Sequence, residues 1–202
     1  MNPHLAAPPV RVGRALAKAR KVAVVVHGRA QDPVYMLEHL VERLDLPDVA
    51  YVLPPAAGGS WYPARFNAPR KANEPWLGHA LEAVEAALAD LTPERVVLAG
   101  FSQGGCLVAD LLARAPRPYA GAAVLTGALI GPEGDVTKAG PLDGLPVYME
   151  TSRYDEWVPL ERVEATAGAL EAAGARVELE VADDPEHRIR DAAVAGVRAL
   201  LS

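Results

Sequence analysis

The clearest candidate for chemistry is a serine set between glycines, in the stretch Gly100-Phe101-Ser102-Gln103-Gly104. This Gly-x-Ser-x-Gly pattern is typical of a tight turn between a strand and a helix, which holds the serine in strained dihedrals and exposes its hydroxyl. We expect a Cβ at either glycine to clash with the neighbouring strand or helix. An ordinary glycine-containing turn is the alternative, because so short a pattern also arises by chance.

The surroundings of Ser102 favour the first interpretation. The apolar run "VVLAG", from Val96, is typical of a buried strand, and "QGGCLVADLLAR", from Gln103, has the composition of a helix. A Gly-x-Ser-x-Gly motif in that context is interpreted as a nucleophile elbow. We therefore expect Ser102 to be a nucleophile.

A serine nucleophile needs a base to take its proton and an acid to orient that base. After an elbow serine the partners follow in the order Asp or Glu, then His. His187 alone follows Ser102, because the other histidines come earlier: His4, His27, His39 and His79. His187 lies in "DDPEHRI", between the last predicted strand and helix, and a solvated loop histidine is the alternative. His27 is interpreted as a structural residue that ties its loop.

Asp155 is the favoured acid. It lies in "ETSRYDEWVP", just beyond the end of a predicted strand. The chain between Asp155 and His187 has room for one helix and one strand, which would bring their two loops side by side. The rival carboxylates are Asp183, Asp184 and Glu156. The first two are too close to His187 in sequence to lie on the adjacent loop.

Two backbone N–H groups are expected to bind the oxyanion of a tetrahedral intermediate. One belongs to Gln103, which follows the nucleophile at the start of its helix. The other comes from the loop after "VAVVVHG", and the favoured residue is Arg29.

Strand and helix patterns alternate along the chain. The predicted strands are "KVAVVV" from Lys21, "VAYVL" from Val49, "RVVLAG" from Arg95, "GAAVLT" from Gly121, "LPVYMET" from Leu145 and "ARVELEV" from Ala175. Helical spacing follows Asp32 and Pro33, and continues over Leu77–Leu91, Pro159–Gly174 and Ile189–Leu200. The alternation predicts an α/β fold, with a mostly parallel sheet covered by helices on both faces. Ligands bind such folds at the carboxyl ends of the strands.

Length, charge and composition exclude several classes of protein. A length of 202 residues predicts a single domain over residues 1–202, and the net charge of −6 without a large basic cluster argues against nucleic-acid binding. There is neither an apolar leader nor a run long enough to span a membrane, so a cytoplasmic protein is expected. The single Cys106 agrees with a reducing compartment and is interpreted as buried filler.

Six stretches together resemble one family. They are "VVVHGRAQDP", "PPAAGGSWYPARFNAPRKANEPWLGHAL", "LAGFSQGG", "TGALIGPEG", "SRYDEWVPLERV" and "PEHRI". In this order they are similar to the phospholipase/carboxylesterase branch of the α/β-hydrolases, which also contains the acyl-protein thioesterases, from about Gly13 onward. The resemblance implies an α/β-hydrolase fold without a cap domain and hydrolysis of carboxylic esters or thioesters. It also implies a nucleophile at Ser102, an acid at Asp155 and a base at His187. The implied oxyanion donors are Arg29 and Gln103.

The chain departs from the family pattern at two places. Ala30 stands where the family usually has a second glycine after the His-Gly pair, which bears on the geometry of the Arg29 donor. Glu186 replaces a glycine that often precedes the catalytic histidine, and its carboxylate is expected either to raise the pKa of His187 or to compete for its proton.

Aromatic and apolar residues on the predicted active-site loops are candidates for a substrate pocket. They are Trp61, Tyr62, Phe66, Leu129, Ile130 and Trp157. The alternative for the first three is that they pack their own long loop. Arg65 and Arg70 could meet a carboxylate or phosphate of the substrate or be solvated, and they stay unassigned.

The expected function is hydrolysis of short-chain or aromatic carboxylic esters through an acyl-enzyme, on a small-molecule substrate and without a cofactor or metal. A lysophospholipase or acyl thioesterase at the same site is one alternative, and a catalytically silent fold that binds a small ligand is another. A metal site built from Asp183, Asp184, Glu186 and His187 lacks a known ligand spacing. A homodimer is one assembly that the sequence leaves open.

Overall fold

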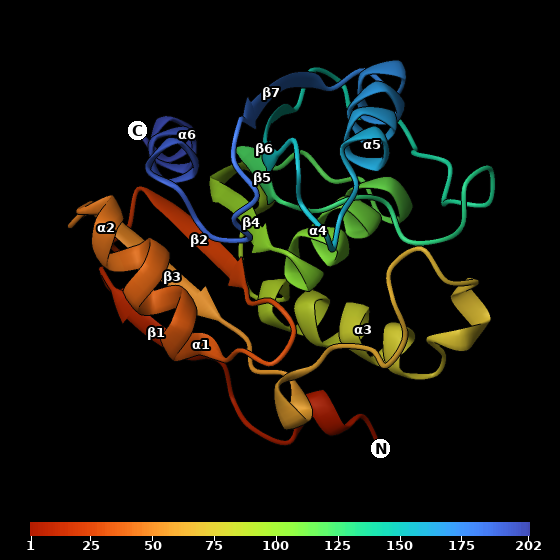
Figure 1. The fold of residues 1–202 in the computed structure, drawn as a ribbon. Helices are drawn as coiled ribbons and strands as arrows, with labels where there is room; N and C mark the ends of the chain where they lie inside the picture. Colours follow the sequence, from red (N-terminus) through yellow and green to blue (C-terminus); the bar gives the residue numbers. More distant parts are fainter.

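The computed structural model describes residues 1–202 and is built around a seven-stranded sheet with the order β1-β3-β2-β4-β5-β6-β7 (Figure 1). The strands are β1 (Val10–Gly13), β2 (Lys21–Val26), β3 (Val49–Leu53), β4 (Val96–Phe101), β5 (Gly121–Leu125), β6 (Pro146–Ser152) and β7 (Arg176–Ala182). The strands β2 to β7 are parallel to one another. The mostly parallel sheet expected from the strand and helix pattern is therefore confirmed.

Helices cover both faces of this sheet. They are α1 (Pro33–Met36), α2 (Glu42–Leu44), α3 (Trp76–Leu88), α4 (Gln103–Arg114), α5 (Leu160–Ala172) and α6 (Asp191–Leu201). Figure 1 shows α1, α2 and α6 on one side of the sheet and α3, α4 and α5 on the other. A π-helical turn, Leu37–Val41, joins α1 to α2, so the helix predicted after Asp32 and Pro33 is made of three short segments.

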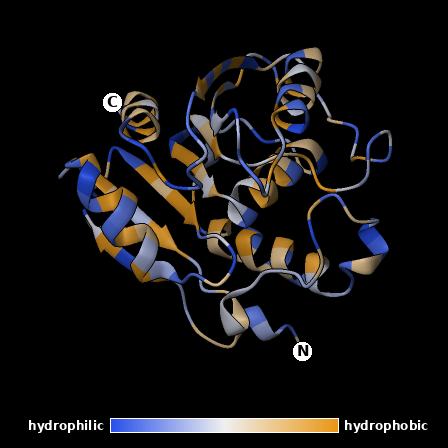
Figure 2. Cartoon of the chain, in the orientation of Figure 1, coloured by the Kyte–Doolittle hydropathy of each residue, from blue (hydrophilic) through white to orange (hydrophobic).

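The two faces of the sheet belong to two separate apolar clusters. Along β2, Val22, Val24 and Val26 pack into the cluster beneath α3, α4 and α5, whereas Ala23 and Val25 pack into the cluster beneath α1, α2 and α6. Successive side chains of a strand point to opposite faces, so a continuous apolar run is what a strand buried on both sides requires. Figure 2 shows this as hydrophobic colour concentrated in the central strands and in the helices beside them.

The edge strand β1 was missed by the sequence analysis. It pairs antiparallel with β3, from Val10 opposite Leu53 to Gly13 opposite Ala50. Three of its four residues are exposed, so the segment lacks the apolar run that marks β2 to β6 in the sequence. An antiparallel strand at the edge of a parallel sheet is a common arrangement.

Most of the predicted helix ends lie within two residues of the observed ends. The Asp32 side chain caps α1 by accepting a hydrogen bond from the Tyr35 N–H at 3.0 Å. Gly174, just past α5, has a φ of +98°, a conformation that an L residue rarely adopts. The helix α3 stops at Leu88, so Leu91 lies beyond it.

None of the helices has the length and apolar composition needed to cross a membrane.

Candidate active site

Ser102 lies between the end of β4 and the start of α4, with a φ of 54° and a ψ of −117°. Its N–H donates to Leu125 O at 2.9 Å. A Cβ at Gly104 would lie 2.2 Å from Val26 O, and one at Gly100 would lie 2.3 Å from Gly104 O. The turn is therefore sterically restricted to glycine at both positions, and the strained backbone of Ser102 is supported by its surroundings.

The structure brings Ser102, His187 and Asp155 into one chain of contacts. His187 Nε2 lies 2.8 Å from Ser102 Oγ, and His187 Nδ1 lies 2.6 Å from Asp155 Oδ2. Asp155 is on the loop between β6 and α5, and His187 is on the loop between β7 and α6. Both loops leave the carboxyl ends of neighbouring parallel strands, which places them side by side despite the separation in sequence.

The Asp155 carboxylate is buried and fully engaged. Its Oδ1 accepts hydrogen bonds from the N–H groups of Trp157 and Val158, both at 2.8 Å, while Oδ2 faces His187. Burial alone would raise the pKa of this carboxyl, but the hydrogen bonds from His187 and from the two backbone groups outweigh it and hold the pKa below its ordinary value. Asp155 is therefore ionised at neutral pH and can orient and stabilise a charged imidazole.

Arg190 anchors the loop that carries His187. Its guanidinium donates to both oxygens of Asp184, at 3.0 and 2.6 Å, to Glu150 Oε1 at 2.8 Å, and to the carbonyl of Glu186. Glu150 belongs to β6, so the contact ties the loop to the sheet. The bonds from Arg190 lower the pKa of Asp184 to about 2. Sequence reasoning missed this role because nothing local marks an arginine as the centre of such a network.

The rival carboxylates have other partners. Asp184 binds Arg190, Asp183 pairs with Arg153 at 3.4 Å, and the Glu186 carboxylate pairs with Arg188. Glu156 is exposed. The acidic side chains near His187 do not converge on a common point where a metal could bind. The Glu186 carboxylate is thus engaged by Arg188 and is not placed to compete for the His187 proton.

The two expected oxyanion donors lie in the same pocket as Ser102. Gln103 is the first residue of α4, so its N–H has no acceptor within the helix. The N–H of Arg29 donates to no group of the protein. Ala30, where the family usually has glycine, adopts a φ of +56° and donates its N–H to Gly59 O at 2.8 Å. The left-handed turn is therefore formed by an alanine, at some cost in backbone strain.

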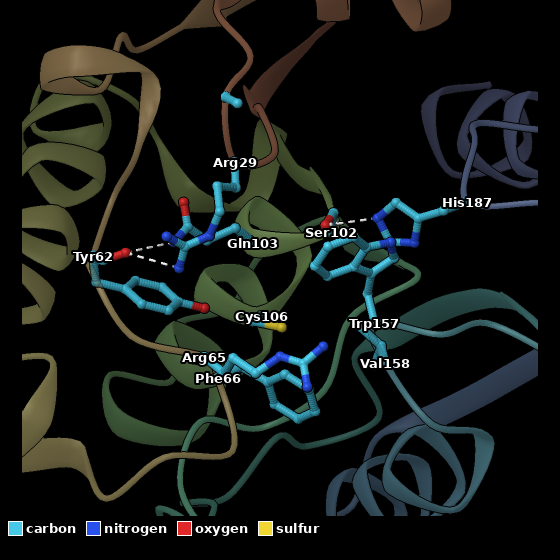
Figure 3. Close-up of a pocket in the computed structure, with 11 residues that line it drawn as sticks. Arg29, Tyr62, Arg65, Phe66, Ser102, Gln103, Cys106, Trp157, Val158 and His187 are labelled. Carbon is cyan, nitrogen blue, oxygen red and sulfur yellow. Dashed lines mark hydrogen bonds between the residues drawn. The ribbon is translucent and has the colours of Figure 1, made fainter.

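The side chains of Arg29 and Gln103 hold the loop that faces them. The Arg29 guanidinium donates to the carbonyls of Tyr62, Pro63 and Ala64, at 3.0, 3.0 and 2.7 Å. Gln103 Nε2 donates to Tyr62 O at 2.8 Å, and its Oε1 accepts the Trp61 N–H at 2.9 Å. Both side chains fix the wall of the pocket, a function that sequence reasoning did not assign to them (Figure 3).

His27 ties its own loop, as the sequence analysis expects. Its Nδ1 lies 2.7 Å from Gly28 O and its Nε2 accepts the Ala56 N–H at 3.1 Å. Burial lowers the pKa of His27. Another histidine, His4, accepts the Ala57 N–H at Nδ1 and lies 3.1 Å from Trp61 O at Nε2. The N-terminal segment thus supports the loop that bounds the active site.

A pocket of about 370 Å³ opens beside Ser102 (Figure 3). Its lining consists of Arg29, Ala30, Tyr62, Arg65, Phe66, Ser102, Gln103, Cys106, Trp157, Val158 and His187. Three of the expected substrate-pocket residues are among them, namely Tyr62, Phe66 and Trp157. The pocket is bounded mainly by apolar and aromatic walls, as small-molecule sites usually are.

The other three expected pocket residues do not line this cavity. The indole of Trp61 is turned into the core, where its Nε1 donates to His27 O at 2.8 Å. Leu129 and Ile130 are also buried, and the Leu129 N–H donates to Thr166 Oγ1 of α5 at 2.9 Å. These residues pack between elements, because a sequence position on an active-site loop does not determine which way its side chain points.

Comparison with known proteins agrees with this geometry. Residues 10–202 match the family model described as Phospholipase/Carboxylesterase. A phospholipase/carboxylesterase from Dyadobacter fermentans is 31% identical, with 96% of each chain covered and a TM-score of 0.85. A carboxylesterase from Mesorhizobium loti is 23% identical over 91% of this chain and 88% of its own, with a TM-score of 0.73, and shares the fold.

One curated protein is also similar. The putative esterase NocK of Nocardia uniformis is 28% identical over 140 residues, which is 66% of this chain and 40% of NocK, so the chain spans less than half of that relative. The family match extends over almost the whole sequence, and the fold is that of the α/β-hydrolases. This chain belongs to the phospholipase/carboxylesterase family.

Proposed function

We propose that the protein is a serine carboxylesterase that hydrolyses short-chain or aromatic carboxylic esters through an acyl-enzyme intermediate. The observation that carries the proposal is the continuous contact from Ser102 Oγ to His187 Nε2, 2.8 Å, and from His187 Nδ1 to Asp155 Oδ2, 2.6 Å. A nucleophile, a base and an orienting acid in hydrogen-bond reach of one another are the arrangement that acyl transfer through serine requires.

In the acylation step, Ser102 Oγ forms a bond to the ester carbon while its proton passes to His187 Nε2. The negative charge that develops on the carbonyl oxygen is bound by the N–H groups of Arg29 and Gln103. When the tetrahedral intermediate collapses, the bond to the alcohol oxygen breaks and His187 returns the proton to the leaving alcohol. Asp155 stabilises the imidazolium while it exists.

In the deacylation step, His187 takes a proton from water and the resulting hydroxide equivalent attacks the acyl carbon. Collapse of the second intermediate breaks the bond to Ser102 Oγ, which regains its proton from His187. The products are a carboxylic acid and the free serine. No redox partner or cofactor enters the proposed cycle, and we propose that residues 1–202 perform it as a single domain.

Two features support small or aromatic esters as substrates. The pocket of about 370 Å³ has apolar walls at Phe66, Val158 and Trp157. Trp157 is 58% exposed, so this side of the site is open to solvent, which suits a small soluble ester. Lysophospholipids and acyl thioesters are alternative substrates for the same residues, and a chain-length series of esters and thioesters would distinguish them.

Cys106 also lines the pocket, yet we assign it no chemical role. Burial raises the pKa of its thiol to about 11, so the thiol stays protonated near neutral pH. Its Sγ accepts the Ala128 N–H at 3.4 Å. A Cys106→Ser variant should therefore keep most of the esterase activity.

The experiment that tests the proposal compares the protein with Ser102→Ala on 4-nitrophenyl acetate. The variant should lose turnover and should no longer be labelled by a fluorophosphonate, because no other activated hydroxyl remains. Ser202→Ala, which removes an exposed serine at the chain terminus, serves as the control and should behave like the parent. Hydrolysis by Ser102→Ala at the parent rate would overturn the assignment and favour the alternative of a ligand-binding protein.

A further inference from the structure

Two arginines near the pocket, Arg65 and Arg70, have different surroundings. The Arg70 guanidinium makes a bidentate pair with Asp110, at 2.5 and 3.0 Å, and contacts Thr137 Oγ1 at 3.2 Å. Asp110 is completely buried, so this arginine is committed to holding its loop against α4. Arg65 makes neither a hydrogen bond through its guanidinium nor an ion pair. Its donors are available to a ligand.

Arg65 is nonetheless held in place at the pocket. Its guanidinium lies 5.6 Å from the centre of the Trp157 ring, a cation–π contact between two residues that line the cavity (Figure 3). Its backbone is fixed by Asn73, a fully buried side chain whose Nδ2 donates to Arg65 O at 3.2 Å and whose Oδ1 accepts the Ala64 N–H at 2.7 Å. The loop thus presents Arg65 from a supported position.

The charge of the pocket is opposite to that of the chain. The whole protein has a net charge of −6, but the lining residues include two arginines and neither aspartate nor glutamate. The Arg29 guanidinium already donates hydrogen bonds to three loop carbonyls. Arg65 is therefore the cation of the pocket that can bind a ligand. A guanidinium with free donors matches the planar geometry of a carboxylate and can bind it through two parallel hydrogen bonds.

We infer that the pocket selects esters that carry a free carboxylate, such as monoesters of dicarboxylic acids, and that Arg65 is the specificity-determining residue. The methylene or aromatic part of such a substrate packs on Phe66, Val158 and Trp157, and its carboxylate pairs with Arg65. This inference rests on the proposed function for the reacting end of the substrate. It adds a charged subsite that the apolar walls alone do not predict.

The first test compares two substrates of equal chain length, mono-4-nitrophenyl adipate and 4-nitrophenyl hexanoate, each corrected for spontaneous hydrolysis. We expect the ratio of kcat/KM, adipate over hexanoate, to fall roughly three- to fivefold in Arg65→Gln, because a hydrogen-bonded ion pair at an exposed side chain is lost. The ratio is the readout, because loss of the contact between Arg65 and Trp157 affects both esters alike. Arg65→Glu should lower the ratio further and favour 4-nitrophenyl 6-aminohexanoate.

Arg114→Gln is the matched control, since Arg114 is exposed at the end of α4 and outside the pocket. It removes the same charge and should leave the ratio unchanged. A ratio that is equal in the parent and Arg65→Gln would overturn the inference, as would an equal fall in Arg114→Gln.

A binding measurement separates this inference from the proposed function. On Ser102→Ala protein, the dissociation constant of ethyl hydrogen adipate should be lower than that of ethyl hexanoate, and the added change Arg65→Gln should remove the difference. Equal dissociation constants would overturn the carboxylate subsite even if the parent hydrolyses both esters. Absence of turnover in the parent, with the binding difference intact, would instead overturn only the esterase proposal.

Discussion

His187 Nδ1 lies 2.6 Å from Asp155 Oδ2, and the other oxygen of that carboxylate accepts two backbone hydrogen bonds. The carboxylate therefore cannot rotate without losing three contacts. It fixes the orientation of the imidazole, and it leaves Nε2 directed at Ser102 Oγ. This relationship explains why a single replacement at Asp155 should have a large effect on rate.

Asp155→Asn is expected to lower kcat by about 10³- to 10⁴-fold with little change in KM. The amide cannot stabilise an imidazolium as a carboxylate does. Steady-state kinetics on 4-nitrophenyl acetate measure the effect, and Glu156→Gln, at the exposed neighbouring carboxylate, should remain near the parent rate.

Arg190→Gln should weaken both stability and catalysis. Removing the guanidinium leaves the buried Glu150 without its charged partner, a loss that costs about 3 kcal/mol of unfolding free energy in comparable buried pairs. The His187 loop also loses its link to β6, so kcat should fall more than KM changes. Urea unfolding and steady-state kinetics measure the two effects.

The control for that prediction is Arg188→Gln, on the same loop. Arg188 pairs with Glu186 on the exposed surface, so its loss should change stability by less than about 1 kcal/mol. If Arg188→Gln and Arg190→Gln changed stability and kcat equally, the proposed role of Arg190 in anchoring the His187 loop would be contradicted.

The elbow glycines and a helical glycine should respond in opposite directions to the same change. Gly104→Ala places a Cβ 2.2 Å from Val26 O, which is backbone and cannot move aside, so we expect a loss of at least about 2 kcal/mol. Gly168 lies within α5, where the position that a Cβ would take is open space, so Gly168→Ala should stabilise the protein by about 0.5 to 1 kcal/mol. Denaturant unfolding of both variants tests the contrast, and a stable Gly104→Ala would refute the steric account of the elbow.

Acid should destabilise the protein through His27. Burial lowers the pKa of this residue below its ordinary value of 6.5. When the pH is below 6.5 but above the folded pKa, His27 therefore binds a proton in the unfolded chain and not in the folded protein. Its contribution to stability is complete above 6.5 and is lost as the pH falls toward the folded pKa. Unfolding free energies measured on both sides of this value should give a shallower pH slope for His27→Gln. The exposed His39→Gln is the control, and an unchanged slope in His27→Gln would contradict the prediction.

Local sequence was enough for the strands and helices at the centre of the fold. The apolar runs of β2 to β6 have to be buried on both sides, and this need predicts a parallel sheet between two helical layers. The strand β1 escaped prediction because its four mostly exposed residues have no such run. Its position depends on pairing with β3, a contact between distant parts of the chain.

By itself, the sequence determined the strained turn at Ser102 and the order in which a base and an acid could follow it, because glycine requirements and chain order are local or one-dimensional properties. Only the tertiary structure decided which side chains face one another. It directed Asp155 at His187, assigned Asp184 to Arg190, turned Trp61 into the core and left Arg65 free at the pocket. Those outcomes depend on the packing of distant loops at one edge of the sheet, where side-chain direction is set by neighbours that no local pattern specifies.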